Sequence, residues 1–277
     1  MGMKRFLPPA GMAMLFIVSQ IIAVMVAPSF KDAGIEAFDN PEDPMNIVQI
    51  FAILLVFTIF ILIIAKYREK MVKYIILFFF FLASISIFQG FFYFIIPSLS
   101  AILAIATSII MIALLIYHPE WYVIDAFSVF IAGGMAAIFA ISLAVEYIVL
   151  LLIALAIYDA ISVYRTKHMI TLAKTITSSN LPLLLMVPKK LSFSYRKSSI
   201  EGEERDAVYV GLGDFIIPGM LVVASYLEMG WLGFIATMCG ALLGYAVLMI
   251  LIARGPQPGL PFLNGFALAA YGIAHLL

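Results

Sequence analysis

Two aspartates lie inside apolar stretches of the chain that otherwise carry almost no charge. They are Asp159, in the run Ile157-Tyr158-Asp159-Ala160, and Asp214, in the run Gly211-Leu212-Gly213-Asp214. A carboxylate within a membrane span costs about 2.5–3.5 kcal/mol even on lenient insertion scales, so each aspartate is a candidate functional residue. Two carboxylates that share a site do not both ionise, and such a pair can activate water: the ionised group acts as a general base while the protonated group polarises a carbonyl. These residue types therefore indicate peptide-bond hydrolysis without a metal or a covalent nucleophile.

The composition is that of a membrane protein. Of the 277 residues, 65% are hydrophobic and 12% are charged, and the mean hydropathy is +1.14. A soluble domain carries about twice this charged fraction. The formal net charge is zero, so no overall field favours nucleic acid as a partner.

Apolar runs of about 20 residues are long enough to cross a bilayer. Their number predicts an all-α polytopic membrane protein with nine transmembrane helices, at about 8–28, 46–65, 73–95, 98–117, 122–144, 147–164, 207–227, 231–253 and 259–276. The first run follows Lys4-Arg5 as in a signal peptide. It is longer than the usual apolar segment of about 7–15 residues, and Pro28 would follow the cleavage site. We therefore predict that it is a retained span.

The basic residues determine the predicted orientation. With nine spans and a cytoplasmic amino terminus, one side of the membrane holds Lys4, Arg5, Lys66, Arg68, Lys70, Lys73, Arg165, Lys167, Lys174, Lys189, Lys190, Arg196, Lys197, Arg205 and Arg254. The other side holds the 29–45 loop, where Lys31 is the single basic residue among five acidic ones. This distribution follows the positive-inside rule and places the carboxyl terminus outside.

The spans predict a single transmembrane domain over residues 1–277. Its parts are six spans in 1–164, a cytoplasmic loop with an interfacial helix in 165–206, and three spans in 207–277. Within the loop, we expect a bent apolar piece, Leu181 to Met186, after the interfacial helix. Directly after the loop, Val208-Tyr209-Val210 is β-prone rather than helix-prone.

The predicted topology places the two aspartates at matching depth. Asp159 lies six residues before Arg165, the first basic residue after the sixth span, and Asp214 lies six residues after Val208, near the start of the seventh. At 1.5 Å per residue, each lies about 9 Å inside the cytoplasmic face. The two spans are consecutive and antiparallel, so we expect the two carboxylates to meet.

Other chemistries have little support in the sequence. The chain contains no His-Glu-x-x-His zinc motif and no Gly-x-Ser-x-Gly serine motif. Asp125 is four residues from Trp121, and we predict that it reaches the membrane interface. The run from Gly240 to Gly244 has the Gly-x-x-x-Gly pattern and predicts close helix packing. The alternative function is a proton- or cation-coupled transporter that uses the same two carboxylates. Transporters often show broken helices in both halves of the chain. Here Gly and Pro interrupt mainly the last three spans, which argues against a transporter.

The flanking residues carry a resemblance to a known family. Tyr158-Asp159 in one span and Gly211-Leu212-Gly213-Asp214-Phe215 in the next resemble the paired signatures of presenilins and signal peptide peptidases, the GxGD intramembrane aspartyl proteases. The family's third element is Pro-Ala-Leu at the start of the last span. Here the stretch is Pro258-Gly259-Leu260-Pro261, with Gly in place of Ala. The nine spans, the cytoplasmic amino terminus and the short loops look most like an archaeal presenilin homologue.

The resemblance implies an aspartic endopeptidase that hydrolyses peptide bonds within transmembrane segments of other membrane proteins. It implies Asp159 and Asp214 as catalytic residues. It also implies a substrate-binding role for Tyr158, Gly211, Leu212, Gly213, Pro258, Gly259, Leu260 and Pro261. No metal or cofactor is expected. The expected partners are transmembrane polypeptides and the lipid bilayer, and a homo-oligomer is a possible assembly. The expected localisation is that of a multi-pass membrane protein, in the cell membrane if the source is prokaryotic.

Two structural interpretations of the segment 258–261 stay open from the residues alone. Its two prolines either prevent a clean helix start, which the resemblance implies lies beside the aspartates, or mark an ordinary helix start with Pro in the first turn. The resemblance further implies that Val208-Tyr209-Val210 pairs with an unwound substrate strand.

Overall fold

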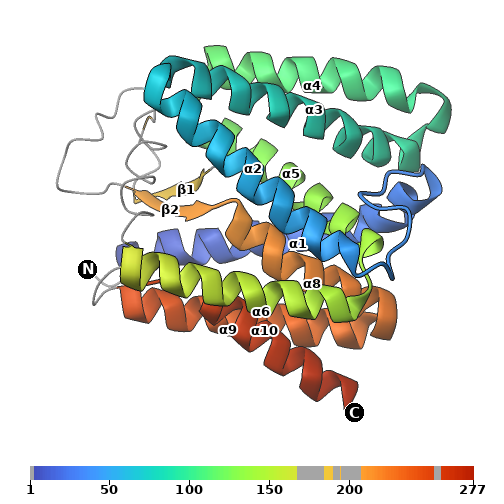
Figure 1. Cartoon of the computed structure of the whole chain (residues 1–277), viewed down its shortest axis with the longest axis vertical. Helices are drawn as coiled ribbons and strands as arrows, with labels where there is room; N and C mark the ends of the chain where they lie inside the picture. Colours follow the sequence, from blue (N-terminus) through green and yellow to red (C-terminus); the bar gives the residue numbers. More distant parts are fainter. Residues whose placement is uncertain (1–2, 167–183, 190–193, 195–206, 253–256) are drawn as a thin grey trace.

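The computed structural model describes residues 3–166, 184–189, 194, 207–252 and 257–277 (Figure 1). Its described residues form nine α-helices: α1 (Met3–Asp32), α2 (Met45–Tyr67), α3 (Glu69–Ile95), α4 (Ser100–Tyr117), α5 (Trp121–Ser142), α6 (Val145–Ile161), α8 (Gly213–Met229), α9 (Trp231–Ile252) and α10 (Leu260–His275). Seven of them, α1 to α6 and α9, are long and apolar enough to cross a membrane. Helices α8 and α10 have 17 and 16 residues, and α6 has 17 residues but continues directly as the helical turn Ser162–Thr166.

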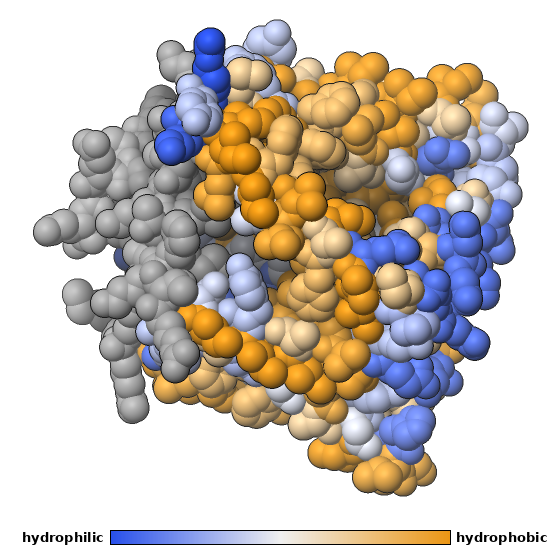
Figure 2. Space-filling view, viewed as in Figure 1, coloured by the Kyte–Doolittle hydropathy of each residue, from blue (hydrophilic) through white to orange (hydrophobic). Residues whose placement is uncertain are grey.

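The helices coincide with the predicted apolar runs to within a few residues, except at residue 207. There the predicted span begins as a strand, and the helix starts only at Gly213. Figure 2 shows the consequence of the apolar runs, a band of hydrophobic side chains that gives way to polar residues at one end of the molecule. The predicted interfacial helix falls largely within 167–183, and Arg254 within 253–256, both outside the described residues.

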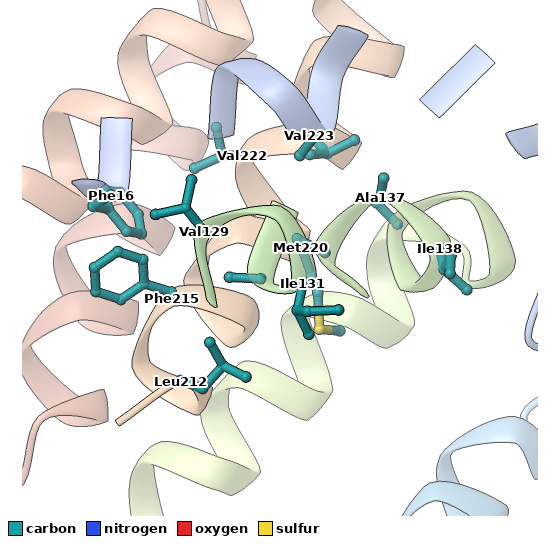
Figure 3. Close-up of a cluster of buried hydrophobic side chains, with 14 of the residues drawn as sticks. Phe16, Val129, Ile131, Ala137, Ile138, Leu212, Phe215, Met220, Val222 and Val223 are labelled. Atoms are coloured by element: carbon teal, nitrogen blue, oxygen red, sulfur yellow. The ribbon is translucent and has the colours of Figure 1, made fainter. Parts of the chain in front are cut away.

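Helix α5 lies at the centre of the bundle. It packs against α1, α3 and α8, and small residues allow the close approach. Gly133 faces the backbone of α1 at Ser19, while Gly134 faces Ile87 of α3, as is common where membrane helices meet. Figure 3 shows the resulting core, in which α5 side chains such as Val129 and Ile131 gather with side chains of α8.

The predicted packing role of Gly240 and Gly244 is confirmed. Both glycines lie on α9 directly against the backbone of α10, at Phe266 and Phe262. A side chain at either glycine would push α10 away, because these approaches leave no room for a Cβ atom. The pair therefore fixes where α10 lies.

The helical fold contains one small sheet that the fold prediction did not include. Strand β1 (Leu184–Pro188) pairs antiparallel with β2 (Ala207–Gly211), with Leu184 opposite Gly211. The β-prone run at 208–210 is indeed a strand. Its partner strand includes the end of the predicted bent apolar piece. Local sequence did not reveal the pairing, because it joins residues 19 to 27 positions apart.

The register of the sheet shows which edge each residue faces. In an antiparallel pair, a residue points its N–H and C=O to the same side, and that side alternates along the strand. The Met186 N–H donates to Oδ1 of Asp125, on α5, at 2.8 Å, so Met186 faces away from β2. Tyr209, opposite Met186, therefore directs its backbone groups to the far edge of β2, while Val208 and Val210 face β1.

Candidate active site

Asp159 lies in the last turn of α6. Its side chain is 6% exposed. The helix continues after Ile161 as a π-helical turn, Ser162–Thr166. Such wide turns inside or at the end of α-helices are frequent at functional sites. The apolar run thus ends in a buried carboxylate followed by an irregular turn.

Asp214 lies in the first turn of α8, directly after the sheet. Strand β2 ends at Gly211, and Leu212 is the residue that precedes the helix. A methyl group at Gly211 would lie 3.6 Å from Oδ2 of Asp214, so the end of the strand lies next to this carboxylate. The unpaired N–H groups of a helix N-terminus favour negative charge there. The strand-to-helix junction therefore positions this carboxylate.

The segment 258–261 contacts both aspartates. Helix α10 begins at Leu260, with Pro261 in its first turn, and the first N–H groups of a helix have no partner within it. The Leu260 N–H donates to Oδ2 of Asp159 at 3.0 Å. A methyl group at Gly259 would lie 3.2 Å from Oδ1 of Asp214. The segment is an ordinary helix start with Pro in the first turn, and this start lies beside the aspartates.

Asp159 and Asp214 are therefore neighbours in space. Leu260 touches Asp159, and the preceding residue, Gly259, touches Asp214. Helices α6, α8 and α10, which carry these groups, all pack against one another. Two carboxylates in this arrangement can share a proton and a water molecule.

Two further hydrogen bonds tie α10 and the chain before it to α6. The buried Asn264 donates its side-chain N–H to the backbone C=O of Leu152 at 3.0 Å. On the other side of the aspartates, the Tyr164 hydroxyl donates to Oε1 of Gln257 at 2.6 Å. The segment 258–261 is thus held from both ends, and the sequence offered no signal for either contact.

Helix α1 supports the residue next to Asp214. The side chain of Gln20, fully buried, donates from Nε2 to the backbone C=O of Phe215 at 3.2 Å. The Gln20 amide packs directly against Gly219, and a methyl group at Gly219 would collide with it. The rings of Phe16 and Phe215 meet edge to face with centroids 5.3 Å apart (Figure 3). The first turn of α8 is therefore packed and hydrogen-bonded from α1.

The other predicted substrate-binding residues divide into two groups. Leu212, Pro258 and Leu260 are buried around the aspartates, whereas Gly213 is exposed. Tyr158 is adjacent to Asp159 in sequence, but its side chain is 61% exposed on α6. The structure therefore does not bring the Tyr158 side chain into the cluster with the two carboxylates.

Asp125 is not the interfacial residue that the sequence suggested. It is 3% exposed and accepts the Met186 N–H of β1. The prediction was wrong because it considered only the distance along α5 to Trp121, whereas strand β1, some sixty residues later, covers this part of α5. The signal that should have flagged Asp125 is the one that flagged Asp159: a carboxylate in an apolar run.

Among the described residues, no three His, Cys, Asp or Glu side chains gather as a metal site would require. The family described as signal-peptide peptidase, presenilin aspartyl protease matches residues 13–277 of the chain. Two solved structures of a presenilin family intramembrane aspartate protease, in space groups C222 and P2, are 31% identical to the chain, each with a TM-score of 0.73. The first alignment covers 99% of this chain and 100% of that one, and the second 96% of each. A comparison with curated protein sequences gave no match.

Proposed function

Because the chain belongs to the signal-peptide peptidase and presenilin family of aspartyl proteases, it is an aspartic endopeptidase of membranes, and we propose that Asp159 and Asp214 are its catalytic dyad. The observation that carries this proposal is the contact of one segment, Gly259-Leu260, with both carboxylates. A peptide bond that lies along this segment would be within reach of both acids.

The proposed reaction uses one water and one shared proton. The ionised carboxylate takes a proton from the water, whose oxygen attacks the peptide carbonyl carbon, while the protonated carboxylate donates a hydrogen bond to the carbonyl oxygen. The tetrahedral intermediate collapses as the leaving amine takes up a proton from the dyad. Products are one new carboxylate and one new amine, and the dyad returns to its singly protonated state. The shared proton belongs to the pair and not to one carboxylate, because a coupled pair titrates as a unit.

The proposed topology has nine transmembrane helices in one domain, with the amino terminus cytoplasmic and the carboxyl terminus outside. Two observations support it. Helix α1 starts at the end of the bundle where β1 and β2 lie, and α10 ends toward the opposite end (Figure 1). The short helices α8 and α10 flank the dyad, where strand β2 and the segment 258–261 extend the chain beyond the helices.

The function is tested by reconstituting the purified protein in liposomes with a single-span membrane substrate. We expect cleavage products by mass spectrometry, with the cut inside the membrane segment. The same liposomes, loaded with a pH-sensitive dye, test the transporter alternative. Proton flux without any cleavage product would overturn the proposal.

We further propose that β2 pairs with an unwound strand of the substrate. This idea predicts the effect of Val210→Pro. Val210 faces β1 in the ladder, so Pro removes an N–H on which the sheet depends and β2 loses its strand conformation. We expect the rate of cleavage of a membrane-span substrate to fall by about tenfold or more, which corresponds to the loss of roughly one buried hydrogen bond. The measurement is the initial rate in liposomes.

The matched control is Val210→Thr, which keeps both the N–H and the β-branched shape. It should cleave at the wild-type rate. Turnover by Val210→Pro equal to that of wild type would remove the role of the strand.

A further inference from the structure

The buried carboxylate of Asp125 has no part in the chemistry described above. One oxygen, Oδ1, accepts the Met186 N–H, and the other, Oδ2, is buried without a hydrogen-bond partner among the described residues. Burying a carboxylate with so few partners is costly, and in a membrane span such a group is a functional candidate by default. The contact is also the one side-chain hydrogen bond described between α5 and β1.

The side chains of the two strands specify their register weakly. Residues 184–187 of β1 and 208–210 of β2 are apolar throughout, apart from the Tyr209 hydroxyl. If β1 slips by two residues along β2, every side chain stays on the face of the sheet where it was. Burial of apolar side chains therefore discriminates poorly between the two registers. A slip that brings Pro188 to the place of Met186 would leave Asp125 facing a residue without an N–H. The carboxylate therefore distinguishes one register from its neighbour.

The register matters because the sheet leads directly to the dyad. Only Leu212 and Gly213 separate the end of β2 from Asp214. On the outer edge of β1, Asp125 occupies the Met186 N–H, so an added strand finds that position taken. Tyr209 points its backbone groups to the opposite edge, that of β2.

We propose that Asp125 is a positioning residue that locks β1 on β2 in one register and thereby determines where a substrate is cut. The effect on the cut position rests on the proposed function of the dyad and of β2. The lock on the register is a property of the folded chain by itself. Asp125 acts as a hydrogen-bond acceptor, so the role belongs to its geometry and not to its charge.

Two substitutions separate acceptor from charge. Asp125→Asn keeps Oδ1 as an acceptor, and we expect it to cut the membrane-span substrate at the wild-type positions. Asp125→Leu removes the acceptor, and we expect additional cut positions and a rate lower by about tenfold. Mass spectrometry of the products gives the positions, which a merely destabilised enzyme would leave unchanged. The matched control is Ser128→Ala, one turn further along α5, which removes a buried hydroxyl without a described partner and should change neither quantity.

A cross-linking experiment reads the register without any proteolysis. In a Cys239→Ser background, which removes the single native thiol, the pair Met186→Cys with Tyr209→Cys reports the observed register. The pair Met186→Cys with Gly211→Cys reports a slip of two residues, since its Cα atoms in the observed register lie beyond the reach of about 7 Å for a disulfide.

With Asp125 or Asp125→Asn, we expect a disulfide only between positions 186 and 209. With Asp125→Leu, we expect disulfides in both pairs, 186 with 209 and 186 with 211. An unchanged cross-linking pattern in Asp125→Leu would overturn the proposal, as would an Asn variant that behaves like Leu. A changed register with no cleavage by any variant would leave the lock intact and refute the proposed function instead.

Discussion

Replacing either Asp159 or Asp214 by Asn is expected to abolish cleavage of membrane-span substrates, with a loss in kcat of at least about 1,000-fold. Asn has the shape of Asp, and its carbonyl oxygen can still accept the Leu260 N–H that Asp159 accepts. It neither takes a proton from water nor returns one to the leaving amine. The loss is therefore chemical. Product formation in liposomes, followed by mass spectrometry, measures it.

The stability of the same variants distinguishes this loss from unfolding. Burying a carboxylate costs more than burying a neutral amide of the same shape, so replacing one by Asn should leave Tm in detergent unchanged or raise it. Asp32→Asn is a suitable control, because Asp32 is an exposed acid at the end of α1 and its loss should affect neither rate nor Tm. Abundant products from either dyad variant would exclude Asp159 and Asp214 as the catalytic pair.

Gly259→Val is expected to lower kcat by about 100-fold, the scale on which a displacement of about 1 Å near reacting groups acts. A methyl group at this position already lies 3.2–3.3 Å from the Asp214 carboxylate. Ala requires the carboxylate to yield by a few tenths of an ångström and should lose activity only a few-fold. The two further methyl groups of Val fill the space between the segment 258–261 and Asp214. Initial rates for the three proteins give the series Gly, Ala, Val.

Gly265 provides the matched control on the same helix. It lies one turn beyond the segment, on α10, and a methyl group there would meet nothing within 4 Å. Gly265→Val should therefore retain wild-type activity, although it carries the same change in a helix. If Gly259→Val were as active as Gly265→Val, the segment 258–261 would not lie close to the reacting groups.

Much of the helical frame follows from the sequence alone. A helix that crosses a bilayer must satisfy its own backbone and present about 20 apolar residues to lipid, which is a local requirement. The apolar runs therefore predicted the helix bounds to within a few residues. Residues 208–210 likewise indicated a strand, because β-branched and aromatic side chains suit a pleated surface. The partner strand, β1, could not be predicted in this way, because Leu184 to Met186 has no strong preference for a strand.

The site divides in the same way. The apolar surroundings of Asp159 and Asp214 marked both as candidate functional residues, and counting residues along the two runs predicted that they lie at one depth. The contact of Leu260 with Asp159, across a separation of 101 residues, did not follow from the sequence. The burial of Asp125 under β1 also did not follow from the sequence, which placed Asp125 at the membrane interface. Patterns of hydrophobicity and charge report where each residue lies along its own helix, whereas the rotation of α6, α8 and α10 about their axes is decided by packing against other helices. Local patterns thus account for the helices and for two acids in apolar runs, because hydropathy depends on each segment alone. That Gly259 and Leu260 touch both acids, and that Asp125 accepts a hydrogen bond from β1, follows from packing between segments far apart in the chain.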